Sequence, residues 1–270
     1  AGGCATGTYY RAGEGLVGSW FALVAYATTA AASKTGLLSV VTSWVKGLWV
    51  TNLTTIPATI GLPSWGGVVI LAAVTGLVVH RFIVLERSRP AQIQLPAQRT
   101  GLAHLLLEKQ WNPLATGFLV GVVAVIAWPT SWASGRPDGL GITTPSSNLV
   151  NLIVTGDVKR LDWGVLLVLG ILLGSYLAAK ASGEFRVRVP SAQVIQRSIA
   201  GGVLMGIGAA WASGCSIGNA LVQTSLLSWQ GWIALVFQVL GVGVAAWFLL
   251  IRPRQRRRAE RAASRVPATV

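Results

Sequence analysis

The sequence alternates long apolar stretches with shorter polar ones, and the apolar stretches set the predicted architecture. Five of them lie at 16–32, 65–84, 112–128, 163–181 and 231–251. Each approaches the ~20 residues with which an α-helix crosses the hydrocarbon core of a bilayer. The strands of an outer-membrane barrel would alternate in polarity over about 10 residues, and runs such as "WGVLLVLGILLGSYLAA" do not. The pattern predicts an all-α polytopic membrane protein.

Several other stretches fit neither a regular span nor a regular loop. Residues 36–50 are interrupted by a lysine and a glycine, residues 198–212 are rich in glycine, and residues 101–111 are typical of a short interfacial helix. Residues 51–65 and 129–153 mix Gly, Pro, Ser and Thr with apolar residues. Irregular backbone is tolerated at membrane depth only where it is buried in protein or lines a cavity, so these stretches favour broken or re-entrant helices at a transport site. For 129–153, an ordinary loop outside the membrane is an equal alternative.

Composition and charge agree with a membrane protein. Of the 270 residues, 53% are hydrophobic and 11% are charged, whereas a soluble domain carries about 25% charged residues. The net charge of +14 is concentrated in the connectors 85–110 and 183–197 and in the C-terminal tail. Basic connectors mark the cytoplasmic side and attract anionic membrane lipid, and no nucleic-acid-binding fold accompanies them. We therefore expect a single transmembrane transport domain, 1–252, in a bacterial-type inner (plasma) membrane, a basic cytoplasmic tail, 253–270, and no nucleic-acid partner.

A short motif occurs twice. Residues 1–8 read "AGGCATGT" and residues 212–219 read "ASGCSIGN", so that G-C-x-x-G superposes without a gap. With one inserted residue the following helices align as well, "WFALV" from Trp20 with "WIALV" from Trp232. The recurrence predicts an internally repeated helical bundle with one cysteine in each half, a common build among transporters. The first copy lacks the glycine-dense helix that precedes the second, so an N-terminal part is expected to be missing, and the orientation of the repeats stays open.

The glycines on either side of each cysteine indicate what the motif does. Glycines take backbone angles closed to other residues, so each motif is expected to break a membrane helix. The free N–H groups at the start of a half-helix carry the positive end of the helix dipole and bind anions. A thiol at the break is a small, polarizable, weak S–H donor, which suits a large, soft anion. The predicted substrate-binding residues are Cys4 and Cys215 with their glycine frames, Gly3, Gly7, Gly214 and Gly218.

Alternatives stay open for the cysteines and for two charges near the first motif. Each cysteine alone would be read as a small buried hydrophobe, and a disulfide between Cys4 and Cys215 would instead staple the two halves. Neither cysteine has a second cysteine or a histidine near it in the sequence, so no metal site is expected, and no cofactor. Arg11 either attracts the anion at the mouth of the site or pairs with Glu14.

The stretches "GGCATGTYYRAGEG" and "GVLMGIGAAWASGCSIGNAL" resemble the YeeE/YedE family of membrane sulphur transporters, and the resemblance extends from residue 1 to about residue 251. It implies an all-helical bundle with short broken helices at its centre. It also implies a relay in which thiosulfate passes between cysteines, here Cys4 and Cys215, through S–H···S hydrogen bonds and without covalent change. A small cytosolic TusA-type sulphur-carrier protein is the implied partner. The family pattern has a further cysteine before the first G-C motif, which this sequence lacks.

The sequence therefore predicts an importer of thiosulfate, or of a closely related sulphur oxyanion, rather than an enzyme. Cys4 and Cys215 would contact the sulphur end of the ion, while N–H groups of the glycine frames and Asn219 hold the oxyanion end. A transporter of a selenium or other sulphur compound is one alternative. The other is a membrane thiol oxidoreductase or sulphurtransferase that uses both cysteines covalently. The apolar, glycine-rich settings argue against it, because a reactive thiolate needs an electropositive, accessible environment.

Overall fold

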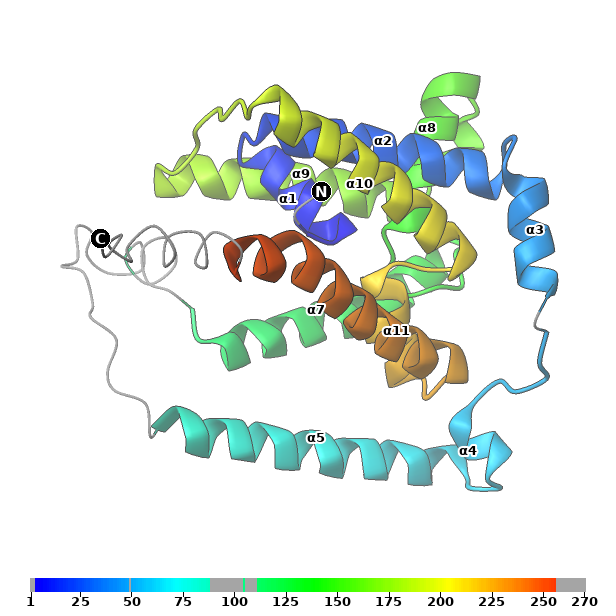
Figure 1. Ribbon diagram of the computed structural model, residues 1–270. Helices are drawn as coiled ribbons and strands as arrows, with labels where there is room; N and C mark the ends of the chain where they lie inside the picture. The colour runs from blue at the N-terminus through cyan, green and yellow to red at the C-terminus, as the bar shows by residue number, and fades with distance from the viewer. Residues whose placement is uncertain (1–2, 49, 88–103, 105–110, 256–270) are drawn as a thin grey trace, which may run out of the picture.

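The computed structural model describes residues 3–48, 50–87, 104 and 111–255. Over these residues the protein is helical, with two isolated β-bridges in place of any sheet (Figure 1), so the all-α prediction is confirmed. The interfacial helix expected at 101–111 lies largely outside the described residues. The α-helices are α1 (Ala5–Gly13), α2 (Val17–Lys34), α3 (Ser39–Gly47), α4 (Ile56–Thr59), α5 (Ser64–Arg87), α7 (Pro113–Ala133), α8 (Thr143–Thr155), α9 (Trp163–Ser182), α10 (Ala192–Trp211) and α11 (Trp229–Ala246). Shorter 3₁₀ and π-helical segments are η1 (Val158–Arg160), η2 (Ile217–Gln223) and η3 (Trp247–Ile251).

Among the described residues, five helices are long and apolar enough to cross a membrane. They are α5, α7, α9, α10 and α11 with its continuation, and they account for four of the five predicted spans. The glycine-rich stretch at 198–212 belongs to α10, which is a full 20 residues long. Residues 36–50 form α3, whose nine residues rise only about 14 Å, too little to cross a core of ~30 Å.

The remaining predicted span, 16–32, forms α2, which buries one side against the bundle and exposes Trp20, Phe21 and Val24 on the other. Tyr26 and several alanines along it are buried. Helix α10 packs closely along α2, because Gly202 and Gly206 leave room for its backbone. A Cβ atom at Gly206 would lie 2.8 Å from the carbonyl oxygen of Tyr26, and one at Gly202 would overlap the carbonyl of Ala22. Close backbone approach of this kind is typical of G-x-x-x-G spacing in membrane helices.

The long helices run side by side and end at two opposite faces (Figure 1). One face holds the ends of α5, α9 and α11 and the starts of α2, α7 and α10, and we call it the tail face. The opposite face, which we call the distal face, holds the connections at 35–63, 134–162 and 212–228. The basic connector at 183–197 lies on the tail face, where the N–H of Val17 donates to the carbonyl of Arg188 at 3.1 Å.

Candidate functional site

Three helical segments begin inside the bundle, and residues at their starts share one hydrophobic cluster. Helix α1 begins directly after Cys4, α8 begins at Thr143, and the chain becomes helical again at Ser216, directly after Cys215. The cluster consists of Ala5, Tyr9, Ala12, Leu23, Tyr26, Ile142, Val168, Ala209 and Cys215. The structure therefore places Cys215 in the same cluster as the helix that Cys4 opens.

Cys4 is the N-cap residue of α1. Its Sγ accepts a hydrogen bond from the N–H of Gly7 at 3.4 Å, and its carbonyl accepts one from the N–H of Thr8 at 2.9 Å. The thiol is free and exposed. Since sulphur takes the capping bond as an acceptor, its S–H remains available as a donor.

Cys215 occupies a comparable position in the second element. Its carbonyl accepts a hydrogen bond from the N–H of Asn219, four residues later, at 2.9 Å, as the carbonyl of Cys4 does from Thr8. Its thiol is also free, but it is buried. Both cysteines are free, so the structure does not contain the disulfide that was one of the alternatives. The shared geometry agrees with an internal repeat, which stays a prediction.

The side chain of Asn219 holds the turn before Cys215 in place. It is almost fully buried at 1% exposure, and its amide donates to the carbonyls of Ala212 at 3.0 Å and Gly214 at 3.1 Å. Its Oδ1 accepts from Nε2 of Gln230 on α11 at 3.0 Å. Both amide donors of Asn219 are thus engaged within the turn.

The reason given above for the motif glycines is wrong. Among the described glycines with positive φ, none belongs to either motif, and the left-handed residue of the second turn is Ser213, with φ 57°. Gly7 lies inside α1, and Gly218 lies inside η2. At Gly214 the physical reason is space, because a Cβ atom there would lie 3.1 Å from Oδ1 of Asn219.

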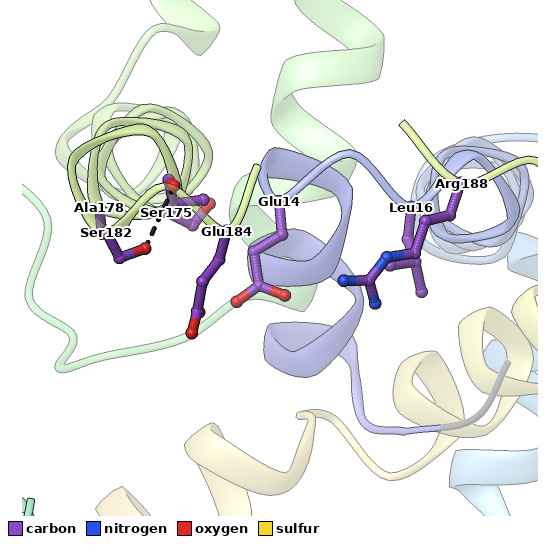
Figure 2. A pocket seen from close by; sticks show the side chains of 8 residues that line it. Glu14, Leu16, Ser175, Ala178, Ser182, Glu184 and Arg188 are labelled. Carbon is purple, nitrogen blue, oxygen red and sulfur yellow. Dashed lines mark hydrogen bonds between the residues drawn. The ribbon is translucent and has the colours of Figure 1, made fainter. Parts of the chain in front are cut away.

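The space beside Gly3 is occupied by the guanidinium of Arg11. This contact helps to decide between the two interpretations of Arg11. A Cβ atom at Gly3 would lie 3.1 Å from a terminal nitrogen of Arg11, so the guanidinium reaches back along α1 toward the residue before Cys4. Glu14 lines a hollow of ≈ 550 Å³ on the tail face with Ser175, Glu184 and Arg188 (Figure 2). The two charges therefore face different surroundings, with Arg11 near the cysteine.

Two tyrosines to which the sequence assigned no role connect α1 and α2 to the first turn of α8. The hydroxyl groups of Tyr9 and Ser146 lie 2.8 Å apart in a hydrogen bond, and the hydroxyl of Tyr26 donates to Oγ1 of Thr143 at 2.9 Å. Both tyrosines are buried, at 1% and 0% exposure. Tyr26 could have been singled out from the sequence, because it lies within an apolar span and a buried tyrosine hydroxyl needs a polar partner. The partner itself lies 117 residues away.

The first turn of α8 has no side-chain cap. Helix α8 has Ile142 at its N-cap, with no side-chain capping bond, whereas Ser, Thr, Asp or Asn is usual there. Its first N–H groups carry the positive end of the helix dipole. Within the described part of the chain, no group of three or more His, Cys, Asp or Glu residues is arranged to hold a metal.

Comparison with known proteins places this geometry in a family. The chain matches the family described as sulphur transport over residues 1–244. The chain belongs to this sulphur transport family. A thiosulfate transporter TsuA from Escherichia coli (strain K12) is 48% identical over 264 residues, which cover 98% of this chain and 74% of the relative. A thiosulfate transporter TsuA from Spirochaeta thermophila is 35% identical over 266 residues, which cover 93% and 74%.

Membership of the sulphur transport family confirms the YeeE/YedE resemblance. The matched region contains both cysteine elements, the buried tyrosines and the whole of α8. Together with five apolar helices of spanning length, it identifies a multi-pass membrane transport protein.

Proposed function

We propose that this sulphur transport family member imports thiosulfate, with Cys4 and Cys215 as successive contacts for the terminal sulphur. The observation that carries the proposal is the placement of two free thiols at the starts of two helical segments that meet at one buried cluster. Two relatives named as thiosulfate transporters support the choice of ion.

The chemistry of the step is hydrogen bonding alone. Thiosulfate carries its charge on three oxygens and one large, polarizable sulphur, and a weak S–H donor matches that sulphur. The ion passes from one thiol to the other without a covalent bond to either. The backbone N–H groups at the helix starts hold the oxygens, and the guanidinium of Arg11 beside Gly3 adds a positive charge near Cys4.

The glycines and Asn219 of the two motifs position neighbouring groups and do not themselves contact the ion. Asn219 uses both amide donors to hold the turn before Cys215, so its amide N–H groups are not left to bind the oxyanion. Gly3 and Gly214 leave space for Arg11 and Asn219 respectively. Gly7 and Gly218 add no side chain of their own to the first helical turn after each cysteine.

The orientation follows from the basic tail. We place the tail face in the cytoplasm, because basic segments next to membrane helices stay on that side, and the membrane is the inner membrane of a bacterial cell. A TusA-type carrier protein would then bind at the tail face, where the hollow around Glu14 lies.

Uptake of labelled thiosulfate into proteoliposomes tests the function with the purified full-length protein. Alanine at Cys4 or Cys215 removes the donor, and uptake is expected to fall at least tenfold, since a donor at the path is lost. Serine keeps a donor with a harder atom and is expected to retain part of the rate. Ser225→Ala, a change at an exposed serine after the second motif that leaves both thiols in place, is the matched control.

Unchanged uptake by all four cysteine variants would remove the thiols from the mechanism. A chemically altered product inside the vesicles would support the oxidoreductase or sulphurtransferase alternative instead. Competition by unlabelled selenium and other sulphur compounds at equal concentration identifies the preferred ion.

A further inference from the structure

An apolar groove of ≈ 530 Å³ lies along the part of α9 that is nearer the tail face. Leu173 and Tyr176 of α9, Trp20 of α2, and Phe185 and Val187 of the connector between α9 and α10 line it together with the end of α1. None of the described residues that line it is charged, and Trp20, Leu173 and Val187 are exposed in it. Its volume is within the range of about 300–1,000 Å³ that is typical of sites for small molecules.

Two short paired segments separate this groove from the polar hollow on the tail face. The N–H of Val17 donates to the carbonyl of Arg188 at 3.1 Å, and the N–H of Arg188 donates to the carbonyl of Gly15 at 3.0 Å. Side chains along extended segments alternate between two faces. Val17 and Val187 accordingly line the groove, whereas Leu16 and Arg188 line the hollow (Figure 2). The pair therefore presents an apolar face to the groove and a polar face to the hollow.

The depth of the groove corresponds to one half of a membrane. Leu169 is the lining residue of α9 that lies farthest from the tail face, and Lys180 near the end of α9 follows it by eleven positions. Eleven positions of a helix rise about 16 Å, which is about half of the ~30 Å hydrocarbon core. A membrane helix of a partner would follow α9 across the whole core, whereas a lipid chain stays in one leaflet. The depth therefore favours a lipid chain as the occupant.

Aromatic side chains surround the groove near the tail face and hold defined orientations. The rings of Tyr176 and Phe185 pack edge to face with their centroids 5.2 Å apart. The indole N–H of Trp20 donates to the carbonyl of Ala12 at 3.0 Å. Tyrosine and tryptophan are typical of the level at which lipid headgroups lie. The groove thus extends from the headgroup level toward the middle of the membrane.

The tail-face end of the groove is positively charged. The ammonium nitrogen of Lys180 lies 5.5 Å from the centre of the Tyr176 ring, and Arg186 is an exposed residue between two residues that line the groove. Within the described part of this region, the carboxylates of Glu14 and Glu184 line the hollow on the other face of the paired segments. Two cationic residues therefore lie at the level where the headgroup of a lipid in the groove would be.

We propose that the groove binds one acyl chain of an anionic glycerophospholipid from the leaflet at the tail face, with its phosphate at Lys180. The apolar walls stabilise the chain in proportion to the apolar area that it covers, and the cations favour a headgroup with a net negative charge. The bound lipid contacts α1, α2, α9 and the connector at once, so it holds these elements together. This lipid site is independent of the ion that the protein transports.

Thermal unfolding of the purified, delipidated full-length protein in detergent tests the site. Added phosphatidylglycerol is expected to raise the Tm by about 5 °C at a near-saturating concentration, and phosphatidylcholine, which carries no net charge, by less than half as much. Val187→Trp fills the groove and is expected to abolish most of the rise, whereas Val189→Trp, an exposed position outside the groove lining, is the matched control. Lys180→Gln is expected to reduce the rise by about half, and Lys159→Gln on the distal face is expected to leave it unchanged.

Equal rises with phosphatidylglycerol and phosphatidylcholine would overturn the preference for an anionic lipid. Equal rises in Val187→Trp and Val189→Trp would overturn the groove as the site. If Val187→Trp does not fold, the comparison of Lys180→Gln with Lys159→Gln still decides, since equal rises in these two variants would overturn the phosphate contact. A dimer in detergent that Val187→Trp dissociates, with no effect of added lipid on the Tm, would assign the groove to a second copy of the chain instead.

Discussion

The buried amide of Asn219, beside the second cysteine, could act in one of two ways. It could hold the turn in place, or it could bind the ion directly. In the structure it folds the turn, through donated hydrogen bonds to Ala212 and Gly214 and an accepted one from Gln230. Asn219→Ala removes these three bonds. At about 1 kcal/mol net for each, the free energy of unfolding is expected to fall by about 3 kcal/mol. A role as a direct ligand of the ion predicts a loss of affinity instead.

Two measurements on the same purified variant separate these roles. Denaturant unfolding in detergent gives the loss of stability, and vesicle uptake gives the half-saturating concentration, which is expected to stay within about twofold of wild type. Gln230→Ala removes the other end of the clamp, and the double variant is expected to be less destabilised than the sum of the two, because the residues share bonds. Gln193→Ala, an exposed amide on α10, is the control. A tenfold rise in half-saturating concentration with unchanged stability would refute the clamp.

Three further substitutions test the central packing and charge. Tyr26→Phe removes the bond to Thr143 and is expected to destabilise the protein by about 1 kcal/mol, measured by unfolding in detergent. Gly206→Val places a side chain 2.8 Å from the backbone of α2 and is expected to lower the amount of folded protein in the membrane, whereas Gly208→Val faces open space and is expected to be tolerated. Arg11→Gln is expected to raise the half-saturating concentration for thiosulfate about threefold, and an unchanged value would contradict its attraction of the anion.

The sequence predicted most of the long helices because their signals are local. Helix α9 begins after Asp162, whose Oδ1 caps the N–H of Val165 at 2.8 Å, and ends at Gly183, which has φ 78°. The apolar run between these residues has the length of a span. Helix α10 was placed too short, because its first turns contain polar residues, including Arg197, that apolar length alone does not count.

The candidate site was only partly predictable, because its contacts join distant segments. Cys4 and Cys215 were found from a repeated local motif, yet the packing of Cys215 against the helix that Cys4 opens depends on helix contacts that no motif encodes. The bond between Tyr9 and Ser146 crosses 137 residues, and Ser146 lies in the stretch for which a loop and a re-entrant helix were equal alternatives. Asn219 was expected to face the ion because the motif gave its position but not the direction of its amide.

The polar groups at the centre divide into those that hold the helices and those left to face the ion. Tyr9, Tyr26 and Asn219 direct their side chains to protein partners, so the proposed path is left to thiols and to N–H groups of first helical turns. Such weak donors suit transport, because a site that conducts must release its ion as well as bind it. Selection of thiosulfate over sulfate is thus expected to depend on the terminal sulphur, because sulfate presents only oxygen atoms to the two thiols.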